Sequence, residues 1–280
     1  IARLGAKPVF VDIEKESLNI DLSNISELVN QKTKAIIPVH IYGRMAELDP
    51  LIKLKANFEI SIVEDVAQAL GAKNSLGMAG SIGDLGCFSF YPTKNLGAFG
   101  DAGMITTSSN DLANRIRSLR IHGSLNGKNY ESIGGNFRLD TIQAAVLLVK
   151  LRKIDEWNKE RYELANNYDK LIEQVGIQEF VHPPVILENE HVFHQYVVRV
   201  AYREELKEFL HSENVSTGIY YTEPLHLQPC FKYLGYKKGD FPECELACSE
   251  VLSLPIFPGL KIEEQVFVVK KIDQFYRAKK

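Results

Sequence analysis

Residues 86–107 read GCFSFYPTKNLGAFGDAGMITT, and this stretch contains the most informative turn of the chain. An aromatic, strand-like run leads to a single lysine, Lys94, and a glycine-punctuated turn leads into a second strand-like run. We therefore predict strands at residues 85–91 and 103–107. A lysine in a turn is often there only for solvation, so its position alone leaves a structural and a chemical interpretation open.

The segments before this turn alternate between strand-like and helical patterns. Runs rich in Val, Ile and Phe predict strands at residues 7–13, 35–41 and 58–64. Amphipathic stretches at residues 23–30 and 46–56 predict helices between them. Strands that alternate with helices favour βαβ units, so we predict an α/β fold with a mostly parallel sheet.

The segments after this turn are mainly helical. We predict a helix at residues 111–120, a polar, glycine-rich loop at 122–136, and one long helix from Asp140 to about Glu173. The part of that helix that reads TIQAAVLLVKL is apolar on nearly every side, so we expect it to be buried. The last third of the chain predicts strands at residues 191–200 and 215–221, and helices near 203–211, 243–252 and 263–276.

The polarity of the long helix changes at Trp157. Before this residue the helix is apolar, and beyond it one side becomes polar. Such a change is typical of a helix that passes from one packed unit to another. We therefore predict a large domain at residues 1–155 and a smaller α+β domain at residues 156–280.

The overall composition excludes several classes of function. Hydrophobic residues make up 45% of the 280 residues and the formal net charge is −3, so we expect no basic surface for nucleic acid or for an anionic membrane. No apolar run approaches the roughly 18 residues of a membrane span. Four cysteines at this length indicate no disulfide framework. We interpret them as small hydrophobic residues in a reducing cytoplasm: Cys87, Cys230, Cys244 and Cys248.

Two of the predicted strands end in residues that suggest a shared ligand site. Asp65 and Gln68 follow one strand, and Ser89, Tyr91 and Lys94 lie at the end of the next. Ligands of open α/β sheets bind at the carboxyl ends of the strands. We therefore expect these side chains to face one crevice.

A lysine, a carboxylate and a hydroxyl in one crevice suit the cofactor pyridoxal 5′-phosphate (PLP). The lysine amine forms a Schiff base with the PLP aldehyde. The carboxylate keeps the pyridine nitrogen protonated, and the hydroxyl donates to the phosphate. The local spacing of Asp65, Gln68, Ser89 and Lys94 alone does not favour this interpretation over a helix-start aspartate and a surface lysine.

Other catalytic and binding motifs are absent from the sequence. The segment GSLNGK at residues 123–128 lacks the spacing of a phosphate loop, and no G-x-G-x-x-G follows a predicted strand. Ser89 is not part of a G-x-S-x-G turn. The histidines show no metal-ligand spacing, so we expect no metal site.

Five segments, in the same order along the chain, resemble the DegT/DnrJ/EryC1/StrS family of PLP-dependent nucleotide-sugar aminotransferases. They read VEDVAQALGA, CFSFYPTKNLGAFGDAG, GGNFRLDTIQAAVLLVKL, YYTEPLHLQPCF and SEVLSLPIFPGL. The resemblance covers essentially the whole chain. It implies the type I PLP-dependent transferase fold, as in aspartate aminotransferase, with a mostly parallel sheet in the large domain and a smaller α+β C-terminal domain.

The resemblance implies a role for each matching residue. Lys94 matches the Schiff-base lysine, and Asp65 matches the partner of the pyridine nitrogen. Gln68 matches the residue that contacts the ring or its 3-hydroxyl group, and Ser89 matches the phosphate-binding serine. Asn136, in the element G-x-N-x-R, matches a residue that reaches the phosphate from the neighbouring subunit, so the resemblance implies a homodimer.

Three further residues match positions beside the nucleotide sugar. Tyr91 stands where the family places His or Tyr beside the sugar, and Tyr221 and His226 match an element that lines the nucleotide-sugar cleft. An aromatic residue at a strand end often serves packing alone, so a packing role is the alternative for these three residues.

The resemblance also indicates a substrate. The pattern FSFYPTKNLGA-x-GD is most similar to enzymes that aminate C3 of dTDP-3-keto-6-deoxyhexoses, and it implies L-glutamate as the amino donor. One alternative is amination at C4, or of another sugar, by the same residues. Another is a catalytically inactive binding or regulatory protein on this fold. Lys94 argues against a dehydratase of this fold, which has His at this position.

The chain departs from the family pattern in two places. Ala102 stands where the family usually has Gly, which is tolerable unless the residue needs a positive φ. The chain starts with Ile1 rather than Met, and IARLGAKPVFVDIE looks like a helix end running into a strand. We therefore expect a phosphate-binding N-terminal segment to be missing, which would expose apolar surface near residues 1–13 and weaken PLP binding.

Overall fold

The computed structural model describes residues 1–279 and divides the chain into two units. The central unit comprises Val29–Lys159 and the short segment Asn189–His194. The terminal unit comprises Ile1–Leu28, Glu160–Glu188 and the residues from Gln195 onward. The division expected from the sequence, 1–155 and 156–280, differs in that residues 1–28 pack with the C-terminal residues and residues 189–194 pack with the large unit.

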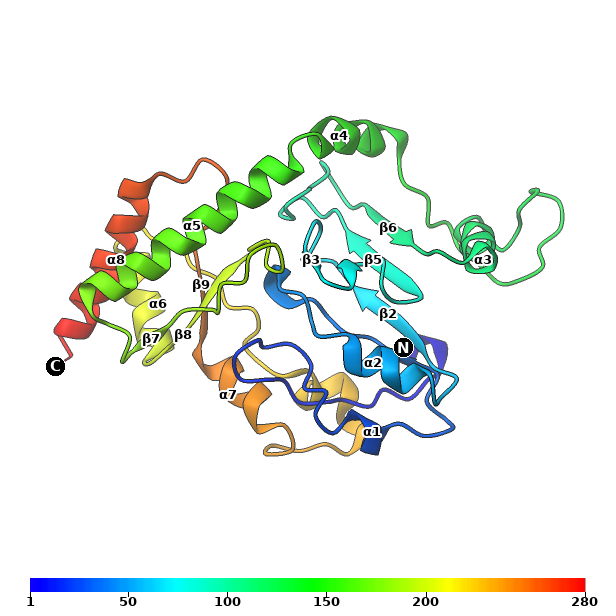
Figure 1. Ribbon diagram of the computed structural model, residues 1–280, viewed down its shortest axis with the longest axis horizontal. Helices are drawn as coiled ribbons and strands as arrows, with labels where there is room; N and C mark the ends of the chain where they lie inside the picture. The colour runs from blue at the N-terminus through cyan, green and yellow to red at the C-terminus, as the bar shows by residue number, and fades with distance from the viewer. Residues whose placement is uncertain (280) are drawn as a thin grey trace. The chain divides into compact units, whose positions relative to one another are not determined.

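The central unit is built on a four-stranded mixed sheet in the order β1-β2-β5-β6 (Figure 1). The first three strands are parallel and β6 is antiparallel to β5. This α/β arrangement agrees with the predicted fold class. The strands are β1 (Ala35–Ile36), β2 (Ser61–Asp65), β5 (Leu85–Ser89) and β6 (Gly103–Thr106), and a small hairpin of β3 (Lys73–Asn74) and β4 (Gly77–Met78) lies between β2 and β5 in the sequence.

The helices of the central unit begin with the 3-10 turn η2 and α2. After the sheet, α3 starts at a Ser109 hydroxyl that accepts a hydrogen bond from the backbone N–H of Leu112 at 3.3 Å. This is the side-chain cap that helix N-termini favour. The bounds are η2 (Ile41–Gly43), α2 (Asp49–Lys55), α3 (Asn110–Arg120), α4 (Thr141–Leu151) and the first part of α5 (Ile154–Val175).

The predicted long helix is two helices, α4 and α5, and the expectation that its apolar half is buried is wrong. In α4 only Leu147 is buried, where it packs in a cluster with Phe90 and Leu96. Ile142, on the same helix, is 75% exposed. An all-round apolar helix meets the core of its own unit on one side only, so its other side chains are left uncovered.

The terminal unit contains a three-stranded antiparallel sheet, ordered β7-β8-β9, with helices α6, α7 and α8. Tyr168 of α5 stacks on Tyr196 of β8 with ring centroids 4.9 Å apart, and both side chains are fully buried. The bounds are η1 (Ala2–Leu4), α1 (Ile25–Leu28), β7 (Val181–His182), β8 (Tyr196–Val200), α6 (Arg203–Ser212), η3 (Leu225–Leu227), η4 (Pro229–Leu234), α7 (Pro242–Glu250), β9 (Val251–Leu254) and α8 (Ile262–Arg277).

Residues 7–13 form no regular strand, contrary to the sequence pattern. Val9 is exposed, whereas the Phe10 ring packs edge-on against Phe231, with ring centroids 5.3 Å apart, and in a tilted arrangement against Tyr236, with centroids 5.6 Å apart. The apolar residues of this segment therefore serve in part an aromatic cluster of the terminal unit rather than a sheet.

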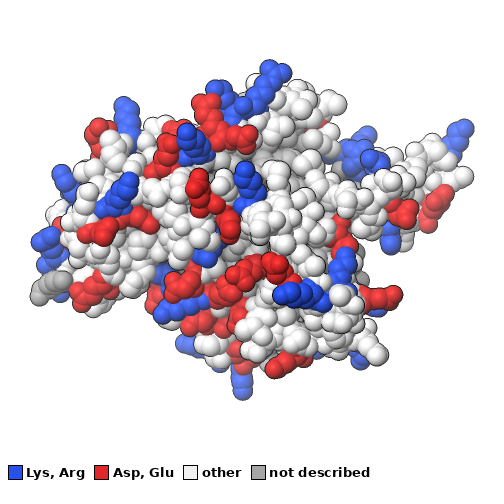
Figure 2. Space-filling view, in the orientation of Figure 1, with Lys and Arg blue, Asp and Glu red and all other residues white. Residues whose placement is uncertain are grey.

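Two surface properties bear on the excluded function classes. Among residues 1–279, no helix has the length and apolar character that crossing a membrane requires. On the face drawn in Figure 2, Lys and Arg side chains are interspersed with Asp and Glu side chains. That face therefore offers no continuous basic surface.

Candidate active site

Asp65 is the last residue of β2, and both its backbone N–H and its carbonyl form hydrogen bonds. Its N–H donates to the Pro38 carbonyl at 2.9 Å, and its carbonyl accepts from the His40 N–H at 3.1 Å. One carboxylate oxygen accepts from the Ala67 N–H at 3.0 Å. Because Asp65 pairs with Cys87 of β5 in a parallel register, both strands present their carboxyl ends at the same edge of the sheet.

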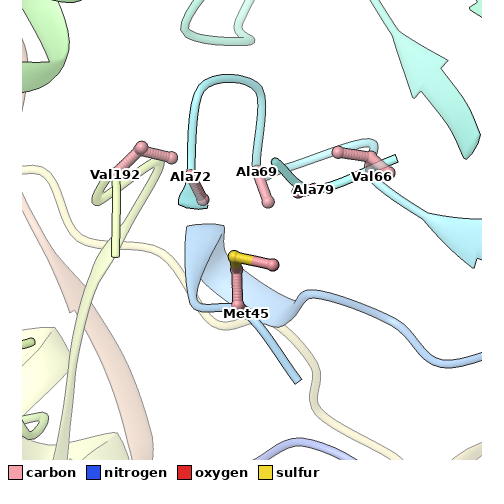
Figure 3. Close-up of a cluster of buried hydrophobic side chains, with 6 residues drawn as sticks. All are labelled: Met45, Val66, Ala69, Ala72, Ala79 and Val192. Carbon is pink, nitrogen blue, oxygen red and sulfur yellow. The ribbon is translucent and has the colours of Figure 1, made fainter. Parts of the chain in front are cut away.

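Gln68 lies three residues beyond Asp65 in a tightly packed turn. Its side-chain oxygen accepts a hydrogen bond from the Tyr42 N–H at 2.5 Å, which orients the amide. The turn rests on a buried apolar cluster, in which Met45 points toward the segment that carries Ala69 (Figure 3). The cluster consists of Met45, Val66, Ala69, Ala72, Ala79 and Val192. This packing fixes the path of the chain after β2.

Ser89, Tyr91 and Lys94 lie together at the end of β5. The Ser89 hydroxyl accepts from the Tyr91 N–H at 3.3 Å, and the Lys94 N–H donates to the Tyr91 carbonyl at 2.8 Å. These bonds close a turn that carries the lysine. Tyr91 is 51% exposed, so its ring is available to a ligand.

The glycine after this turn is required by close packing. A Cβ atom on Gly97 would lie 2.3 Å from the Pro92 carbonyl oxygen, which no side chain tolerates. The next residue, Ala98, donates its N–H to the Phe90 carbonyl at 2.8 Å, and Phe90 in turn donates to the Ala102 carbonyl at 2.8 Å. Ala102 does not adopt a positive φ, so the methyl group that departs from the family pattern causes no strain there.

The electrostatics of Lys94 combine burial with a distant carboxylate. Burial lowers the pKa of the Lys94 amine, and the negative charge of Asp65 partly opposes this shift. Within residues 1–279 the amine forms no ion pair and no side-chain hydrogen bond. A half-buried lysine with a lowered pKa has more of the neutral amine that attacks aldehydes than an exposed lysine has.

The residues present fit a ring-shaped cofactor with an aldehyde. Asp65 ends β2 and Lys94 lies in the turn after the neighbouring parallel strand β5. The Asp65 charge raises the pKa of the Lys94 amine, yet the two side chains form no ion pair in the described part of the chain. Cys87 has its thiol beside the same carboxylate, and burial together with Asp65 raises the pKa of that thiol. The described residues contain no group of His, Cys, Asp and Glu that could hold a metal ion.

The structure does not bring Asn136 to this group. Asn136 pairs with Ile121 at the end of α3, and its side-chain oxygen accepts from the Arg138 guanidinium at 2.8 Å. In Figure 1, α3 and the loop that follows it extend away from the sheet. The exposed Asn136 side chain is therefore not part of the cluster around Lys94 in this chain.

Tyr221 and His226 belong to the terminal unit. Tyr221 is exposed, whereas the His226 imidazole is only 3% exposed. The Nε2 atom of His226 lies 3.0 Å from the Glu245 carboxylate, and its ring packs edge-on against Phe241 at 4.7 Å. The surroundings of His226 are thus those of a packed, paired histidine.

Two sets of supporting residues went unnoticed in the sequence. His40 and Glu64 form a fully buried pair with 3.0 Å between Nε2 and Oε2, directly before Asp65 in the sheet. Asn95, next to Lys94, forms a side-chain network with Asn158 and His194. The adjacency of Glu64 and Asn95 to the predicted site residues is the only signal of them that the sequence carries.

Comparison with known proteins gives one family over nearly the whole chain. Residues 1–273 match the DegT/DnrJ/EryC1/StrS aminotransferase family. A "Pleiotropic regulatory protein" of Geobacillus stearothermophilus is 47% identical over 277 residues, which is 99% of this chain and 74% of the relative. The dTDP-3-amino-3,4,6-trideoxy-alpha-D-glucose transaminase of Streptomyces venezuelae is 35% identical and is matched over 98% of this chain and 72% of its own length.

A solved structure confirms the fold class. The crystal structure of S. venezuelae DesV in complex with a ketimine intermediate superposes with a TM-score of 0.92 at 35% sequence identity. The match covers 98% of this chain and 73% of that chain. The mixed sheet of the central unit therefore belongs to the architecture predicted from the sequence.

Proposed function

The chain belongs to the DegT/DnrJ/EryC1/StrS aminotransferase family, and we propose that it transfers an amino group from L-glutamate to C3 of a dTDP-3-keto-6-deoxyhexose. The family consists of sugar aminotransferases, and the cofactor is PLP. The C3 position and the dTDP sugar are supported by the FSFYPTKNLGA segment around Lys94 and by the S. venezuelae transaminase. The rival candidate is another keto nucleotide sugar, or C4, handled by the same residues.

One observation carries the proposal. Asp65 ends β2, and Lys94 lies in the turn after β5, the neighbouring parallel strand. The Asp65 charge raises the pKa of the Lys94 amine, but the two side chains form no ion pair within residues 1–279. In an ordinary surface turn, the lysine amine would point into solvent or form an ion pair with a neighbouring carboxylate. A half-buried amine that feels the charge of a carboxylate but forms no ion pair with it is the arrangement expected of residues that hold a ligand between them.

Each residue has a defined task in the proposed reaction. When bound, PLP supplies an aldehyde that bonds amines and a ring that withdraws electrons. Lys94 would hold the cofactor through its amine, and its Nζ would remove and return the proton at the reacting carbon of the substrate. Asp65 would accept a hydrogen bond from the protonated ring nitrogen, Gln68 would support the ring and Ser89 would donate a hydrogen bond to the phosphate.

The experiment is a substrate screen with matched lysine variants. Purified protein is mixed with PLP, L-glutamate and, in turn, dTDP-3-keto-, dTDP-4-keto- and UDP-3-keto-sugars, and 2-oxoglutarate and amino sugar are quantified. We expect turnover with the dTDP-3-keto sugar, none in Lys94→Ala, and normal turnover in Lys73→Ala, which alters an exposed lysine of β3. Retained turnover in Lys94→Ala contradicts the assignment, and turnover with only another sugar moves it to the rival substrate.

A regulatory role is the second candidate, because the Geobacillus relative, at 47% identity, is named a regulatory protein. Such a protein needs no amino transfer. Binding of PLP and of the nucleotide sugar without release of 2-oxoglutarate in the same screen would favour this candidate over the enzyme.

We further propose that two copies of the chain form the functional unit and that Asn136 of each serves the partner's phosphate site. Two features support this: Asn136 is exposed on a segment that extends from the sheet, and α4 exposes Ile142, Leu148 and Val149. Exposed apolar surface of this kind commonly marks an interface.

The dimer is tested by sedimentation and by mixing variants. Lys94→Ala and Asn136→Ala subunits are each expected to lose turnover. A mixture of the two is expected to regain part of it, because each mixed dimer contains one site with both residues. A monomer in sedimentation, or no recovery in the mixture, contradicts the shared site.

The cytoplasm is the expected location of the protein. All four cysteine thiols are free in the structure, which suits a reducing compartment. Fractionation of the cells that make the protein tests this directly.

A further inference from the structure

Asn95 follows Lys94 in the sequence, and its side-chain amide is hydrogen-bonded at both ends. Its Nδ2 group donates to the Asn158 side-chain oxygen at 2.8 Å and to the Val192 carbonyl at 3.0 Å. Its Oδ1 atom lies 3.3 Å from Nδ1 of His194. The Val192 carbonyl can only accept, so it fixes which end of the Asn95 amide is the donor. The Oδ1 atom is therefore an acceptor, and His194 carries its proton on Nδ1.

Asn158, near the start of α5, continues this network toward the other side of the site. Its Nδ2 group donates to the Leu70 carbonyl at 3.0 Å. Leu70 lies two residues beyond Gln68, in the turn that follows Asp65. Glycine at position 71 leaves room for this contact, because a Cβ atom there would lie 2.6 Å from the Asn158 amide nitrogen.

We propose that Asn95 and Asn158 are positioning residues that tie the turn carrying Lys94 to the turn carrying Gln68. The two amides form a continuous chain from the residue next to Lys94 to the carbonyl of Leu70. Asn158 accepts from the first turn and donates to the second, so one side chain is bonded to both. We call this pair of amides the bridge, and it holds the turn that carries Lys94 at a fixed separation from the turn that follows Asp65.

The positioning role has a purpose only if the proposed function holds, but the first test of it needs neither PLP nor turnover. The Lys94 amine is probed in protein without PLP, by reductive methylation with formaldehyde and cyanoborohydride at a series of pH values. Peptide mass spectrometry gives the extent of modification of Lys94 and of the exposed Lys73 in the same sample. Burial lowers the pKa of the Lys94 amine. A looser turn would expose the amine, and its pKa would then rise toward the pKa of an exposed lysine.

The variants are Asn95→Ala and Asn158→Ala, each of which breaks the bridge at a different point. Asn74→Ala is the matched control, because it removes an amide that accepts a backbone N–H, that of Leu76 at 3.0 Å, in the β3–β4 hairpin. We expect both bridge variants, but not the control, to shift the Lys94 profile to higher pH while Lys73 is unchanged. Two variants keep the test valid if one of them folds poorly, which circular dichroism reveals.

Affinity for PLP is the second readout. Asn95→Ala removes three side-chain hydrogen bonds and Asn158→Ala removes two, and we expect each change to weaken PLP binding about tenfold because the lysine turn loses order. The double variant should lose little more than either single variant, because both changes break the same bridge. A purely structural role would lower the melting temperature without these selective effects.

The outcomes separate this inference from the proposed function. If wild-type protein binds no PLP, the proposed function fails, and the methylation profiles still decide the role of the bridge. If wild-type protein binds PLP but both bridge variants match Asn74→Ala in methylation profile and affinity, the positioning role is overturned.

Discussion

The Asp65 charge raises the pKa of the Lys94 amine, yet the two side chains form no ion pair within residues 1–279. Burial has the opposite and larger effect on the same amine. The reactivity of Lys94 is therefore a balance between desolvation, which favours the neutral amine, and one carboxylate, which favours the charged form.

Removing the carboxylate should shift that balance in a known direction. In Asp65→Asn the charged form of Lys94 loses its support, so the pKa of Lys94 falls further. Methylation of Lys94 in protein without PLP is expected to move to lower pH and to be about two- to fivefold faster near pH 8. Asp111→Asn, an exposed change at the start of α3, should leave the profile unchanged. A shift to higher pH in Asp65→Asn contradicts the electrostatic account.

The buried pair of His40 and Glu64 should be a main support of the strand that presents Asp65. The Glu64 carboxylate accepts from His40 and from the backbone N–H groups of Gly80, Ile82 and Gly83, at 2.6–3.0 Å. His40 Nδ1 accepts from the Ala46 N–H at 2.9 Å, so the neutral ring carries its proton on Nε2. Four donors thus converge on one buried carboxylate.

Glu64→Gln keeps the shape but replaces one acceptor oxygen with a donor. At least one of the four donors then faces an N–H group, and we expect a loss of about 3 kcal/mol in the free energy of unfolding. Urea titration monitored by circular dichroism measures this loss. The exposed Glu47→Gln is the control and should change stability by less than about 0.5 kcal/mol. Equal stability of the two variants would show that the pair does not support the fold.

The same pair has a defined pH dependence. Burial alone raises the pKa of Glu64, but the hydrogen bonds from His40, Gly83 and Gly80 outweigh it and lower the pKa below 4.5. A carboxylate with a lowered pKa in the folded state contributes stability that is complete above the unfolded value and lost as the pH falls through the folded value. The stability difference between wild type and Glu64→Gln should therefore shrink below pH 4.5.

The sequence predicted where β2 and β5 end better than which of the other extended segments form strands. A short run of β-branched and aromatic residues precedes both Asp65 and Lys94. The change from apolar to polar residues after each run marks the end of the strand. Residues 215–221 have the same composition, yet only Gly218 pairs, with Ser253. Composition shows that a segment can extend, but the neighbours that supply the pairing decide whether it becomes a strand.

The supporting network of the site could not be predicted from the sequence. Asn95 and Asn158 are 63 positions apart, and two asparagines at that separation form no local pattern. Residues 249–254 show a related limit. The sequence predicts a helix to residue 252, whereas α7 ends at Glu250 and β9 begins at Val251, because the next residues pair with β8.

Asp12 should stabilise α7 from the other end of the sequence. The N-terminal neighbour of this helix, Phe241, provides no side-chain cap. Instead the Asp12 carboxylate accepts from the N–H groups of Glu243 at 3.1 Å and Cys244 at 2.8 Å. These are free donors of the first helical turn, and a negative charge there also favours the helix dipole.

We expect Asp12→Ala to lower the free energy of unfolding by about 1 kcal/mol, because both the acceptor oxygens and the charge are lost. Asp12→Asn keeps one acceptor oxygen, so we expect it to lower the free energy of unfolding by about half as much. Urea titration of both variants measures the change. Asp21→Ala serves as the control, because that carboxylate accepts from Ser23 in an exposed turn. If Asp12→Ala is no more destabilising than Asp21→Ala, the long-range cap contributes nothing.

Asp169 should give the terminal unit a stability that falls with rising pH. The carboxylate accepts a hydrogen bond from the Tyr196 hydroxyl at 2.5 Å. Burial nevertheless raises the pKa of Asp169 from 3.8 to about 6, and the bond from Tyr196 opposes this shift only in part. Between these two values the folded protein holds a proton that the unfolded chain releases, so the free energy of unfolding decreases as the pH rises from about 4 to 6.

Asp169→Asn removes this titration and keeps an oxygen that can accept from Tyr196. A shift of about two pKa units corresponds to roughly 3 kcal/mol, and partial exposure reduces it, so we expect the variant to gain about 1–3 kcal/mol at pH 7 and little at pH 4. Urea titrations at both pH values measure the gain, with the exposed Glu208→Gln of α6 as the control. A gain that is equal at pH 4 and pH 7 would mean that the substitution acts through packing and that the Asp169 charge carries no cost.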